Sequence, residues 1–480
     1  MITADRFYIG GAWVAPSGTR TMPILTPSTN ARIGTLTLGN AEDVDRAVAA
    51  ARTAFESYSL TPKPERLALL RRLAGITRAR LDDLGRAISA EMGAPATMAR
   101  EVQAYSGLGH LEGFIAALEA LDEEETLPNG DILSREPIGV CGLITPWNWP
   151  INQIALKVVP VLATGATCVL KPSEHTPLSA QIYAEMVHEA GFPAGVFNLV
   201  HGEGPTVGAA LSRHPDVAMM SFTGSTRAGS AVSRDAAATI KRVTLELGGK
   251  SPNLVFADCD LDARVTEGVA ACFYNTGQSC DAPTRMLVER SVYDRALEIA
   301  RAAAEAQPVG DPAEEGDHIG PLFDRLQYDR VQTMIRKGLD DGARLLAGGP
   351  GRPDGLPERL QGGWFVRPTV FCDVSPDMAI WREEIFGPVL AMTPFDSEEE
   401  AIALANDTDY GLAAYIQTGS EDRAIRVARR LRAGGIHING RDADYGSPFG
   451  GFRQSGNGRE GGRFGLEDYL EMKVRPPFVA

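Results

Sequence analysis

The segment from about residue 138 to residue 246 alternates short apolar runs with helical patterns, and this alternation limits the folds that the chain can adopt. Each apolar run is almost continuous, which is typical of strands that are covered on both faces. Parallel strands need crossover connections, and the helical patterns after each run supply them. The alternation therefore predicts an α/β protein with a parallel, doubly wound sheet, whose strands cover residues 138–144, 166–170, 196–200 and 217–221.

Regular structure is also expected before this segment. The run from Phe7 to Val14 predicts two short strands around a turn at Gly10-Gly11. Residues 41–120 are helical and amphipathic, and Asn40 is a suitable N-cap for the first helix. The acidic stretch 121–126 has little apolar periodicity and predicts a solvated boundary.

The C-terminal half is expected to form a second α/β unit. Strands and helices extend from residue 247 to about residue 440, including a helix at 261–274. Residues 448–458 are too rich in glycine for regular structure. Residues 469–475 alternate weakly and predict a last strand, whose partner sheet could belong to another subunit.

Composition limits the classes of partner. The chain has 480 residues, enough for two or three domains, and a net charge of −15 argues against nucleic acid or an anionic membrane as a partner. The most apolar region, residues 137–170, is broken by prolines and by Lys157, so we do not expect it to cross a membrane. The N-terminus lacks the features of a signal peptide, which favours a cytoplasmic protein.

One of the six cysteines has a setting that favours chemistry. No CxxC pair exists and the seven histidines are scattered, so we expect reduced thiols and no metal site. Cys280 lies on a glycine-containing turn between a helix and the apolar strand that begins at Arg285. A cysteine held on such a turn can attack a carbonyl carbon. Taken alone, an isolated cysteine is more often a small buried hydrophobic residue.

Two further residues could assist such a nucleophile. Asn148 lies in a turn that two prolines and two tryptophans make rigid, so its amide N–H could stabilise a developing oxyanion. A rigid packed turn without chemistry is equally consistent with these residues. Glu246 is flanked by leucines, and partial desolvation would raise its pKa toward the range of a general base. The alternative is a surface glutamate on a half-buried strand.

The chain lacks a GxGxxG fingerprint after its first strand, but other strand ends could bind a nucleotide. Ser225 follows a strand and opens a helix, where free N–H groups attract an anion; an ordinary capped helix is the alternative. Lys171 and Glu174 could bind ribose hydroxyls, unless they are two solvated charges. A carboxylate there would repel a 2′-phosphate, which favours NAD over NADP. Glu384 and Phe386 indicate a second ribose contact beside the nicotinamide, or simply a charged loop.

Together these stretches closely resemble the NAD(P)-dependent aldehyde dehydrogenase superfamily. The resemblance covers almost the whole chain and keeps the order of the family's motifs. It rests on Pro146-Trp-Asn, Lys171-Pro-Ser-Glu, Phe222-Thr-Gly-Ser, Leu245-Glu-Leu-Gly-Gly-Lys, Gly277-Gln-Ser-Cys, Glu384-Ile-Phe-Gly-Pro and Pro448-Phe-Gly-Gly.

The resemblance implies a role for the residues in these motifs. It makes Cys280 the nucleophile, Glu246 the general base, and Asn148 with the Cys280 backbone N–H the oxyanion hole. The other residues would contact the cofactor: Thr145 and Trp147 mainly through backbone, Gly204 near the adenine, Lys171 and Glu174 at the adenosine ribose, Ser225 at the pyrophosphate, Glu384 at the nicotinamide ribose, and Phe386 against the nicotinamide.

The resemblance also implies a fold with a variant Rossmann cofactor domain, a second α/β catalytic domain and a small oligomerisation sheet. We place the cofactor domain at residues 1–117 and 138–246, the catalytic domain at 247–447, and the oligomerisation segment at 118–137 and 465–480. The expected assembly is a homodimer or homotetramer in which the last strand completes the sheet of a neighbour.

The implied reaction oxidises a small aldehyde to the carboxylic acid, with NAD as hydride acceptor. The acyl group would form a thioester on Cys280, and Glu246 would activate the water that hydrolyses it. Relatives that pass the acyl group to coenzyme A typically lack this glutamate. Two other classes stay open: a cysteine-dependent acyl transferase or esterase, and a non-catalytic binding protein on the same fold.

Substrate choice is less clearly encoded. The aromatic cage that some relatives use for betaine aldehyde is incomplete, because Leu156 occupies a position where they carry tryptophan, although Trp149 is present. Asp281 follows the nucleophile and favours a polar or cationic aldehyde, unless it points into a hydrogen-bond network. The charged segment 441–445 could line the mouth of the substrate tunnel or be solvated.

Overall fold

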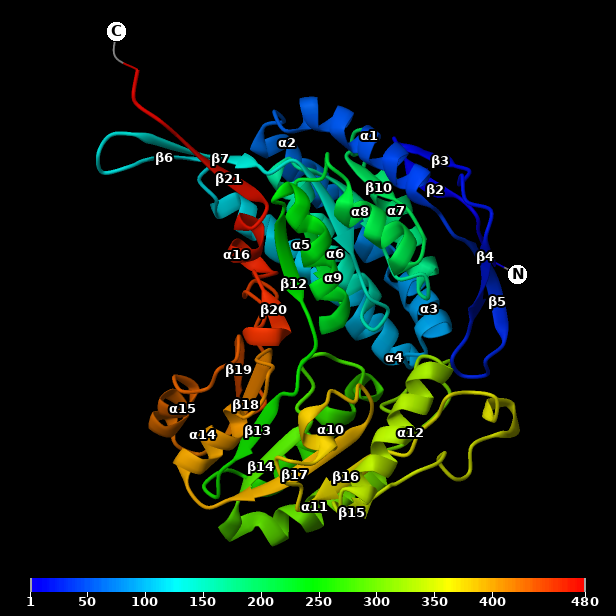
Figure 1. Cartoon of the computed structure of the whole chain (residues 1–480), viewed down its shortest axis with the longest axis vertical. Helices are drawn as coiled ribbons and strands as arrows, with labels where there is room; N and C mark the ends of the chain where they lie inside the picture. The colour runs from blue at the N-terminus through cyan, green and yellow to red at the C-terminus, as the bar shows by residue number, and fades with distance from the viewer. Residues whose placement is uncertain (1, 479–480) are drawn as a thin grey trace.

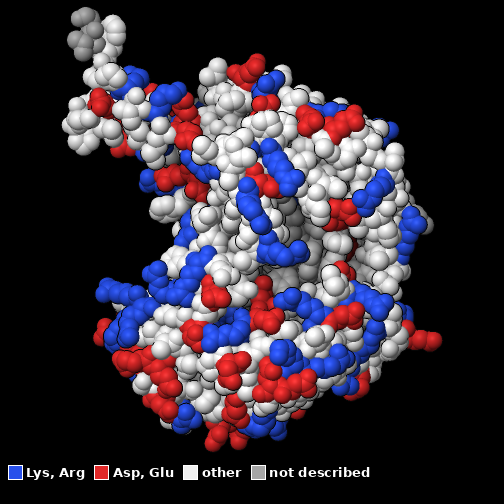
Figure 2. Space-filling view, in the orientation of Figure 1, with Lys and Arg blue, Asp and Glu red and all other residues white. Residues whose placement is uncertain are grey.

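The computed structural model describes residues 2–478, which form two α/β lobes and a projecting arm (Figure 1). The first lobe contains most of the chain before Glu246, and the second contains the chain from there to β19. The arm at the upper left joins the last strand to β6 and β7. Figure 2 shows a hollow between the two lobes, with basic and acidic side chains along its rim.

The first lobe is built on an eight-stranded sheet with the order β20-β12-β11-β8-β9-β10-β2-β3. The five strands from β12 to β10 are parallel, as the alternation predicted. β8 lies between β9 and β11. After β8 the chain adds β9 and β10 on one side of it and then crosses over to add β11 and β12 on the other side. This reversal opens a crevice at the carboxyl ends of β8 and β11. The strands are β2 (Phe7–Ile9), β3 (Ala12–Val14), β8 (Val140–Ile144), β9 (Thr167–Lys171), β10 (Phe197–Leu199), β11 (Met219–Thr223), β12 (Arg242–Glu246) and β20 (Gly456–Asn457).

Helices cover both faces of this sheet (Figure 1). Asn40 caps α1 as expected, since its side chain accepts hydrogen bonds from the N–H groups of Glu42 and Asp43. α4 and α5 are joined by a π-helical segment, Ala99–Ala104. The helices are α1 (Ala41–Tyr58), α2 (Lys63–Ala79), α3 (Leu81–Met92), α4 (Ala96–Met98), α5 (Tyr105–Ala120), α6 (Pro150–Thr164), α7 (Pro177–Glu189), α8 (Ala209–Arg213) and α9 (Thr226–Ala236).

The second lobe contains a seven-stranded sheet with the order β15-β16-β17-β14-β13-β18-β19, in which only β15 is antiparallel. Its strands are β13 (Pro252–Val255), β14 (Arg285–Glu289), β15 (Arg344–Ala347), β16 (Thr369–Cys372), β17 (Val389–Phe395), β18 (Ala413–Gln417) and β19 (Gly435–Ile438). Its helices are α10 (Leu261–Phe273), α11 (Tyr293–Ala306), α12 (Arg325–Asp340), α13 (Ala379–Arg382), α14 (Glu398–Asn406) and α15 (Glu421–Ala428).

Two small sheets complete the molecule. β1 (Ile2–Ala4), β5 (Arg32–Thr37) and β4 (Thr21–Leu25) form one beside the first lobe. In the arm, β21 (Leu470–Arg475) pairs antiparallel with β7 (Ile132–Pro137), which also pairs with β6 (Glu124–Thr126), and the short helix α16 (Gly462–Glu467) precedes β21.

Three local expectations need correction. The last strand does not lack a partner in its own chain, because β7 pairs with it along its whole length. The acidic boundary at 121–126 contains the exposed strand β6. The glycine-rich stretch 448–458 does include regular structure, since β20 adds two residues to the edge of the first sheet. For β21 and β20 a strand far away in the chain supplies the hydrogen bonds, whereas β6 forms a hairpin with the neighbouring strand β7.

Candidate active site

Cys280 lies on a turn built from left-handed backbone conformations. Asn275, Thr276 and Gly277 have φ angles of 52°, 57° and 69°. A Cβ atom at position 277 would lie 2.2 Å from neighbouring backbone, so glycine is required there. The side-chain oxygen of Gln278 accepts a backbone hydrogen bond at 2.9 Å from the loop before α12. The predicted turn is therefore present and is anchored to the second lobe.

Asn148 reaches the same turn from the first lobe. It follows β8, is 4% exposed, and donates a hydrogen bond from Nδ2 to the carbonyl of Gln278 at 3.0 Å. Asn275 Nδ2 donates to the carbonyl of Asn148 at 3.0 Å, and the Trp149 indole donates to Ser279 Oγ at 2.9 Å. These three hydrogen bonds join the rigid turn after β8 to the turn that carries Cys280.

Glu246 ends β12 and is 1% exposed, so the alternative of a surface glutamate is wrong. Neither carboxylate oxygen has a hydrogen-bond partner among residues 2–478. Gly450 leaves room for this side chain, since a Cβ there would lie 2.5 Å from Glu246 Oε1. Burial, followed by repulsion from Glu460, raises the pKa of Glu246 well above its usual range. The carboxyl group is thus desolvated and free of competing donors.

A buried ion pair near Glu246 escaped the sequence analysis. Lys157 on α6 is fully buried and pairs with Glu460, which also accepts a hydrogen bond from Ser221 Oγ at 3.3 Å. Burial has the largest influence on the pKa of Glu246, and the positive charge of Lys157 opposes it. The available signal was a lysine in an otherwise apolar helix, because an unpaired ammonium would be costly there.

The surroundings of Cys280 disfavour its thiolate form. Burial, and then the charges of Asp281, Glu384 and Glu246, raise its pKa well above the ordinary value. A positive charge brought close to the sulfur would favour the thiolate.

Lys171 and Glu174 lie at the carboxyl end of β9 and are not solvated charges. Lys171 Nζ contacts Glu174 Oε2 at 3.0 Å and donates to the Pro172 carbonyl at 2.9 Å. Both side chains are largely buried. Burial opposes ionisation of Glu174, but the charge of Lys171, together with a backbone hydrogen bond, the charge of His175 and the hydrogen bond from Lys171, lowers the pKa of this carboxyl overall. A fixed carboxylate and ammonium therefore face the crevice edge.

The crevice at β8 and β11 contains unused hydrogen-bonding groups. The hydroxyls of Thr145 and Thr223 are buried without a partner among the described residues. Ser225 caps α9, accepting the N–H of Ala228 at 3.3 Å. Gly204 opens the segment before α8, and a Cβ there would meet nothing within 4 Å. Orphaned hydroxyls beside a helix N-terminus suit a polar, anionic ligand such as a dinucleotide.

Aromatic rings and a carboxylate close the other end of the crevice. Trp147 stacks on Phe323 with centroids 4.4 Å apart and meets the edge of Phe386 at 5.7 Å. Glu384 Oε1 accepts the N–H of Gly249 at 3.1 Å, and burial raises the pKa of Glu384 to about 7. The predicted residues Trp147, Glu384 and Phe386 thus lie at the junction between the lobes.

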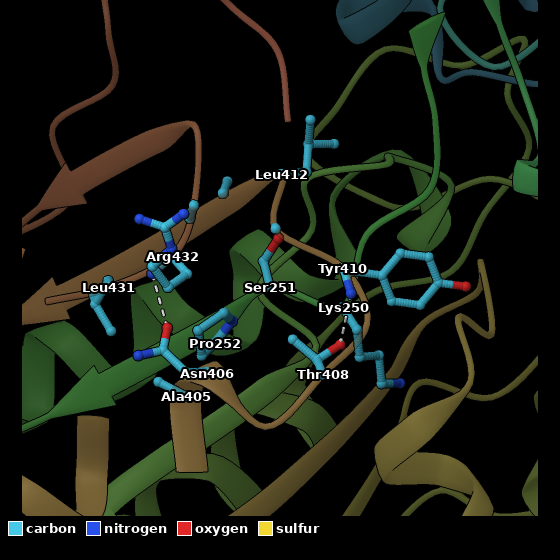
Figure 3. Close-up of a pocket in the computed structure, with 14 residues that line it drawn as sticks. Lys250, Ser251, Pro252, Ala405, Asn406, Thr408, Tyr410, Leu412, Leu431 and Arg432 are labelled. Atoms are coloured by element: carbon cyan, nitrogen blue, oxygen red, sulfur yellow. Dashed lines mark hydrogen bonds between the residues drawn. The ribbon is translucent and has the colours of Figure 1, made fainter. Parts of the chain in front are cut away.

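The segment after Gly249 also borders a separate small pocket of about 10 Å³ (Figure 3). Asn406 Oδ1 accepts the Arg432 N–H there at 2.7 Å. Burial lowers the pKa of Lys250, which lines this pocket, to about 7. None of the predicted site residues lines it, so this pocket is distinct from the crevice.

Asp281 directly follows Cys280 in the chain, and no other described side chain donates a hydrogen bond to its carboxylate. Tyr415 donates instead to its backbone carbonyl at 3.2 Å, and the Tyr415 ring stacks on His437 with centroids 4.5 Å apart. In the segment 441–445, Asp442 pairs with His437 at 3.1 Å and Tyr445 packs against the His110 ring at 4.9 Å. The segment is therefore partly anchored rather than fully solvated.

Comparison with known proteins identifies the family. The sequence profile described as "Aldehyde dehydrogenase family" matches residues 13–475. The chain belongs to the aldehyde dehydrogenase family. It is 51% identical over 469 residues to a 3-succinoylsemialdehyde-pyridine dehydrogenase of a Pseudomonas species, covering 98% of this chain and 97% of the relative.

Solved aldehyde dehydrogenases have the same fold. The enzyme from Bartonella henselae is 48% identical, with a TM-score of 0.96 over 99% of both chains. A variant of aldehyde dehydrogenase C from Pseudomonas syringae, solved with NAD+ and octanal, is 47% identical, with a TM-score of 0.95 over 98% of this chain and 96% of that one. The fold and family expected from the sequence are both confirmed.

This aldehyde dehydrogenase is an oxidoreductase that oxidises an aldehyde with NAD. That outcome gives no support to an acyl transferase, an esterase or a non-catalytic protein. Among residues 2–478 no helix is long and apolar enough to span a membrane, and no cluster of three or more potential metal ligands occurs.

Proposed function

We propose that this aldehyde dehydrogenase uses Cys280 as its nucleophile, Asn148 and the Cys280 backbone N–H as its oxyanion hole, and Glu246 as the base that activates water. The observation that carries the assignment is the 3.0 Å hydrogen bond from Asn148 Nδ2 to the Gln278 carbonyl. It fixes the amide plane two residues from the thiol and leaves the second N–H of Asn148 for a developing oxyanion.

In the first step, the Cys280 thiolate forms a bond to the aldehyde carbon, and the carbonyl electron pair moves to oxygen. Asn148 and the Cys280 backbone N–H donate hydrogen bonds to that oxygen, which carries more charge than in the free aldehyde. NAD, when bound, supplies a nearby positive charge and the acceptor for the hydride. As the carbonyl re-forms, the former aldehyde C–H bond would break with loss of the hydride, which leaves the acyl group as a thioester on Cys280.

In the second step, Glu246 removes a proton from water, and the water oxygen attacks the thioester carbon. The C–S bond breaks, the Cys280 thiolate leaves, and the carboxylic acid is released. Burial suits Glu246 for this task, because a raised pKa makes it a stronger base than an exposed glutamate. The charges of Lys157 and Glu460 would influence the protonation of Glu246, and neither side chain would contact the substrate.

The contacts proposed for NAD follow the crevice. Lys171 and Glu174 would hold the adenosine ribose, Ser225 the pyrophosphate, and Glu384 the second ribose. Phe386 would lie against the nicotinamide, Thr145 and Trp147 would contact the cofactor mainly through backbone, and Gly204 would lie near the adenine. The lowered pKa of Glu174, to which Lys171 contributes against the effect of burial, supports a carboxylate that repels a 2′-phosphate, so NAD is expected over NADP.

The substrate is expected to carry a polar group near the aldehyde. The Asp281 carboxylate lies beside the nucleophile without a donor from another described side chain, which favours a hydrogen-bond donor or a cation. The name of the Pseudomonas relative makes the pyridine semialdehyde a sensible first member of a substrate panel. Unchanged relative kcat/KM values across polar and aliphatic aldehydes in Asp281→Ala would remove this idea.

The assembly is expected to be a homodimer or homotetramer in the cytoplasm, with no nucleic-acid or membrane partner. β21 is the edge strand of the arm, and Met472 and Val474 on it are 70% and 55% exposed. Such apolar residues on a free strand edge support pairing with a neighbouring subunit. The bounds of the three domains given above are likewise proposed, and they rest on the resemblance to the family.

The decisive experiment follows NADH absorbance for wild type and Cys280→Ala with NAD or NADP and a panel of aldehydes. We expect turnover with NAD and the loss of all turnover in the variant. Equal activity of Cys280→Ala would overturn the assignment of the nucleophile, and a strict need for NADP would overturn the reading of Glu174.

A further inference from the structure

Gln103 is a buried glutamine that none of the assignments above uses. It is 0% exposed and lies in the π-helical segment Ala99–Ala104. Arg100 and Glu101, which precede it within this segment, are exposed. A π-helical turn has an extra residue, which changes the face on which the following side chains lie, and such segments are frequent at functional sites. Here the Gln103 amide reaches both turns of the active site.

The amide orientations follow from the carbonyls that they contact. The Gln278 carbonyl accepts from Asn148 Nδ2 at 3.0 Å and from Asn275 Nδ2 at 3.2 Å. The Asn148 carbonyl also accepts from Asn275 Nδ2, at 3.0 Å. Because a carbonyl oxygen only accepts, the nitrogen of Asn275 must face both carbonyls and its Oδ1 must face away from them.

Gln103 completes this arrangement. Its Nε2 donates to Asn275 Oδ1 at 3.0 Å and lies 3.4 Å from the Asn148 carbonyl. Without this donor, Asn275 Oδ1 would lose the hydrogen bond that holds the amide from its other side, and the amide would be held less firmly against the two carbonyls. All four side chains are buried, so water cannot readily replace the lost hydrogen bonds.

We propose that Gln103 is a positioning residue for the oxyanion hole. It holds Asn275, which holds the backbone of Asn148 and Gln278, and so fixes the amide that meets the substrate oxygen. The proposal rests on the roles proposed above for Asn148 and Cys280. It differs from a packing role, which would lower stability without a selective effect on the step that forms an oxyanion.

The test compares Gln103→Met with Gln332→Met. Methionine keeps the length of the side chain and removes its hydrogen bonds. Gln332 is also buried, and it makes two hydrogen bonds with the backbone of Gly351, at 2.7 and 3.2 Å, away from the crevice. The readouts are kcat and KM for aldehyde oxidation, NAD affinity, Tm, and the rate at which iodoacetamide alkylates Cys280, measured on the peptide that contains it.

Alkylation separates the two roles because it forms a C–S bond and expels iodide without any oxyanion. We expect Gln103→Met to lower kcat about tenfold or more, which is less than the loss of an oxyanion donor itself. Its NAD affinity and its alkylation rate should each stay within about twofold of wild type, which corresponds to a free-energy change below 1 kcal/mol. Gln332→Met should lower Tm and leave kcat unchanged.

A second variant covers a failure of Gln103→Met to fold. In Gln103→Glu, an ionised carboxylate would face Asn275 Oδ1 and repel it, whereas the protonated form regains one donor. The ratio of variant to wild-type kcat should therefore rise as the pH falls.

Two results for Gln103→Met would overturn the positioning role. One is a kcat close to that of wild type, and the other is an equal loss in the rates of aldehyde oxidation and of alkylation. A pH-independent ratio for Gln103→Glu would also overturn it. Absence of turnover in wild type, with normal NAD binding and alkylation, would instead contradict the proposed function.

Discussion

The two sides of the active site are held in opposite ways. On the side of Asn148, side-chain amides donate to backbone carbonyls and to one another, and the chain from Gln103 through Asn275 to Gln278 is buried and hydrogen-bonded, although Gln103 Oε1 lacks a partner among the described residues. On the side of Glu246, both carboxylate oxygens lack a partner among the described residues, and a buried ion pair lies nearby.

The difference corresponds to the task of each side. An oxyanion hole works because its donors need no reorganisation when charge develops, so a neutral network of buried hydrogen bonds suits it. A general base must gain and lose a proton, so fixed donors on its oxygens would lower its pKa and weaken it. The following substitutions test this contrast, from the largest expected effect to the smallest.

Glu246→Gln should abolish steady turnover but leave the first half of the reaction. Removing a general base typically costs about 10²–10⁴-fold in rate. We expect NADH formation to stop after about one equivalent per site, since the thioester forms but is not hydrolysed. Rapid-mixing absorbance measures this burst. A slow first turnover would show that Glu246 also serves the attack of Cys280.

Asn148→Ala should slow the first half of the reaction, in which the thioester forms. Loss of one oxyanion donor costs about 10²–10³-fold in rate, and here the loss should appear in the first turnover, so no burst is expected. NAD titration serves as the control for folding. A normal burst in this variant would contradict the oxyanion role of Asn148.

Lys157→Met should combine a pH effect with a loss of stability. Burial is the main cause of the raised pKa of Glu246, and Lys157 opposes it, so its removal should raise that pKa further. Because hydrolysis needs the ionised carboxylate, the rising limb of kcat against pH should move to higher pH. Glu460 would also lose its buried partner, which typically costs about 3–5 kcal/mol of unfolding free energy.

The control is Lys157→Met with Glu460→Gln, which removes both charges. The double variant should recover much of the stability, because no unpaired buried charge is left. Chemical denaturation measures the free energy of unfolding for both. Equal destabilisation of the single and double variants would show that the ion pair is not the reason for the loss.

Glu174→Gln should have the smallest effect. Removing the carboxylate near the proposed ribose site eliminates its repulsion of a 2′-phosphate, and a change of about 1.4 kcal/mol would raise the NADP to NAD ratio of kcat/KM roughly tenfold. The rate with saturating NAD should change little. An unaltered ratio would place the selection against NADP elsewhere.

Much of this fold could be predicted because its signals are local. Continuous apolar strands followed by helices specified the parallel sheet, and Asn40 marked the start of α1 where the structure has it. The turn before Cys280 was visible from its glycine and its position between two regular elements. The partner of the last strand was not, because pairing between β21 and β7 depends on residues far apart in the chain.

The sequence by itself determined the order of the elements, the type of sheet, and the chemical groups available: a thiol, an amide and a glutamate in motifs that resemble one family. Tertiary structure alone decided their states. Lys157 and Glu460 are 303 residues apart, and Gln103 and Asn275 are 172 apart, so nothing in the local pattern relates them. Burial removes water from these groups, and only the folded arrangement determines which are paired and which are left free to react.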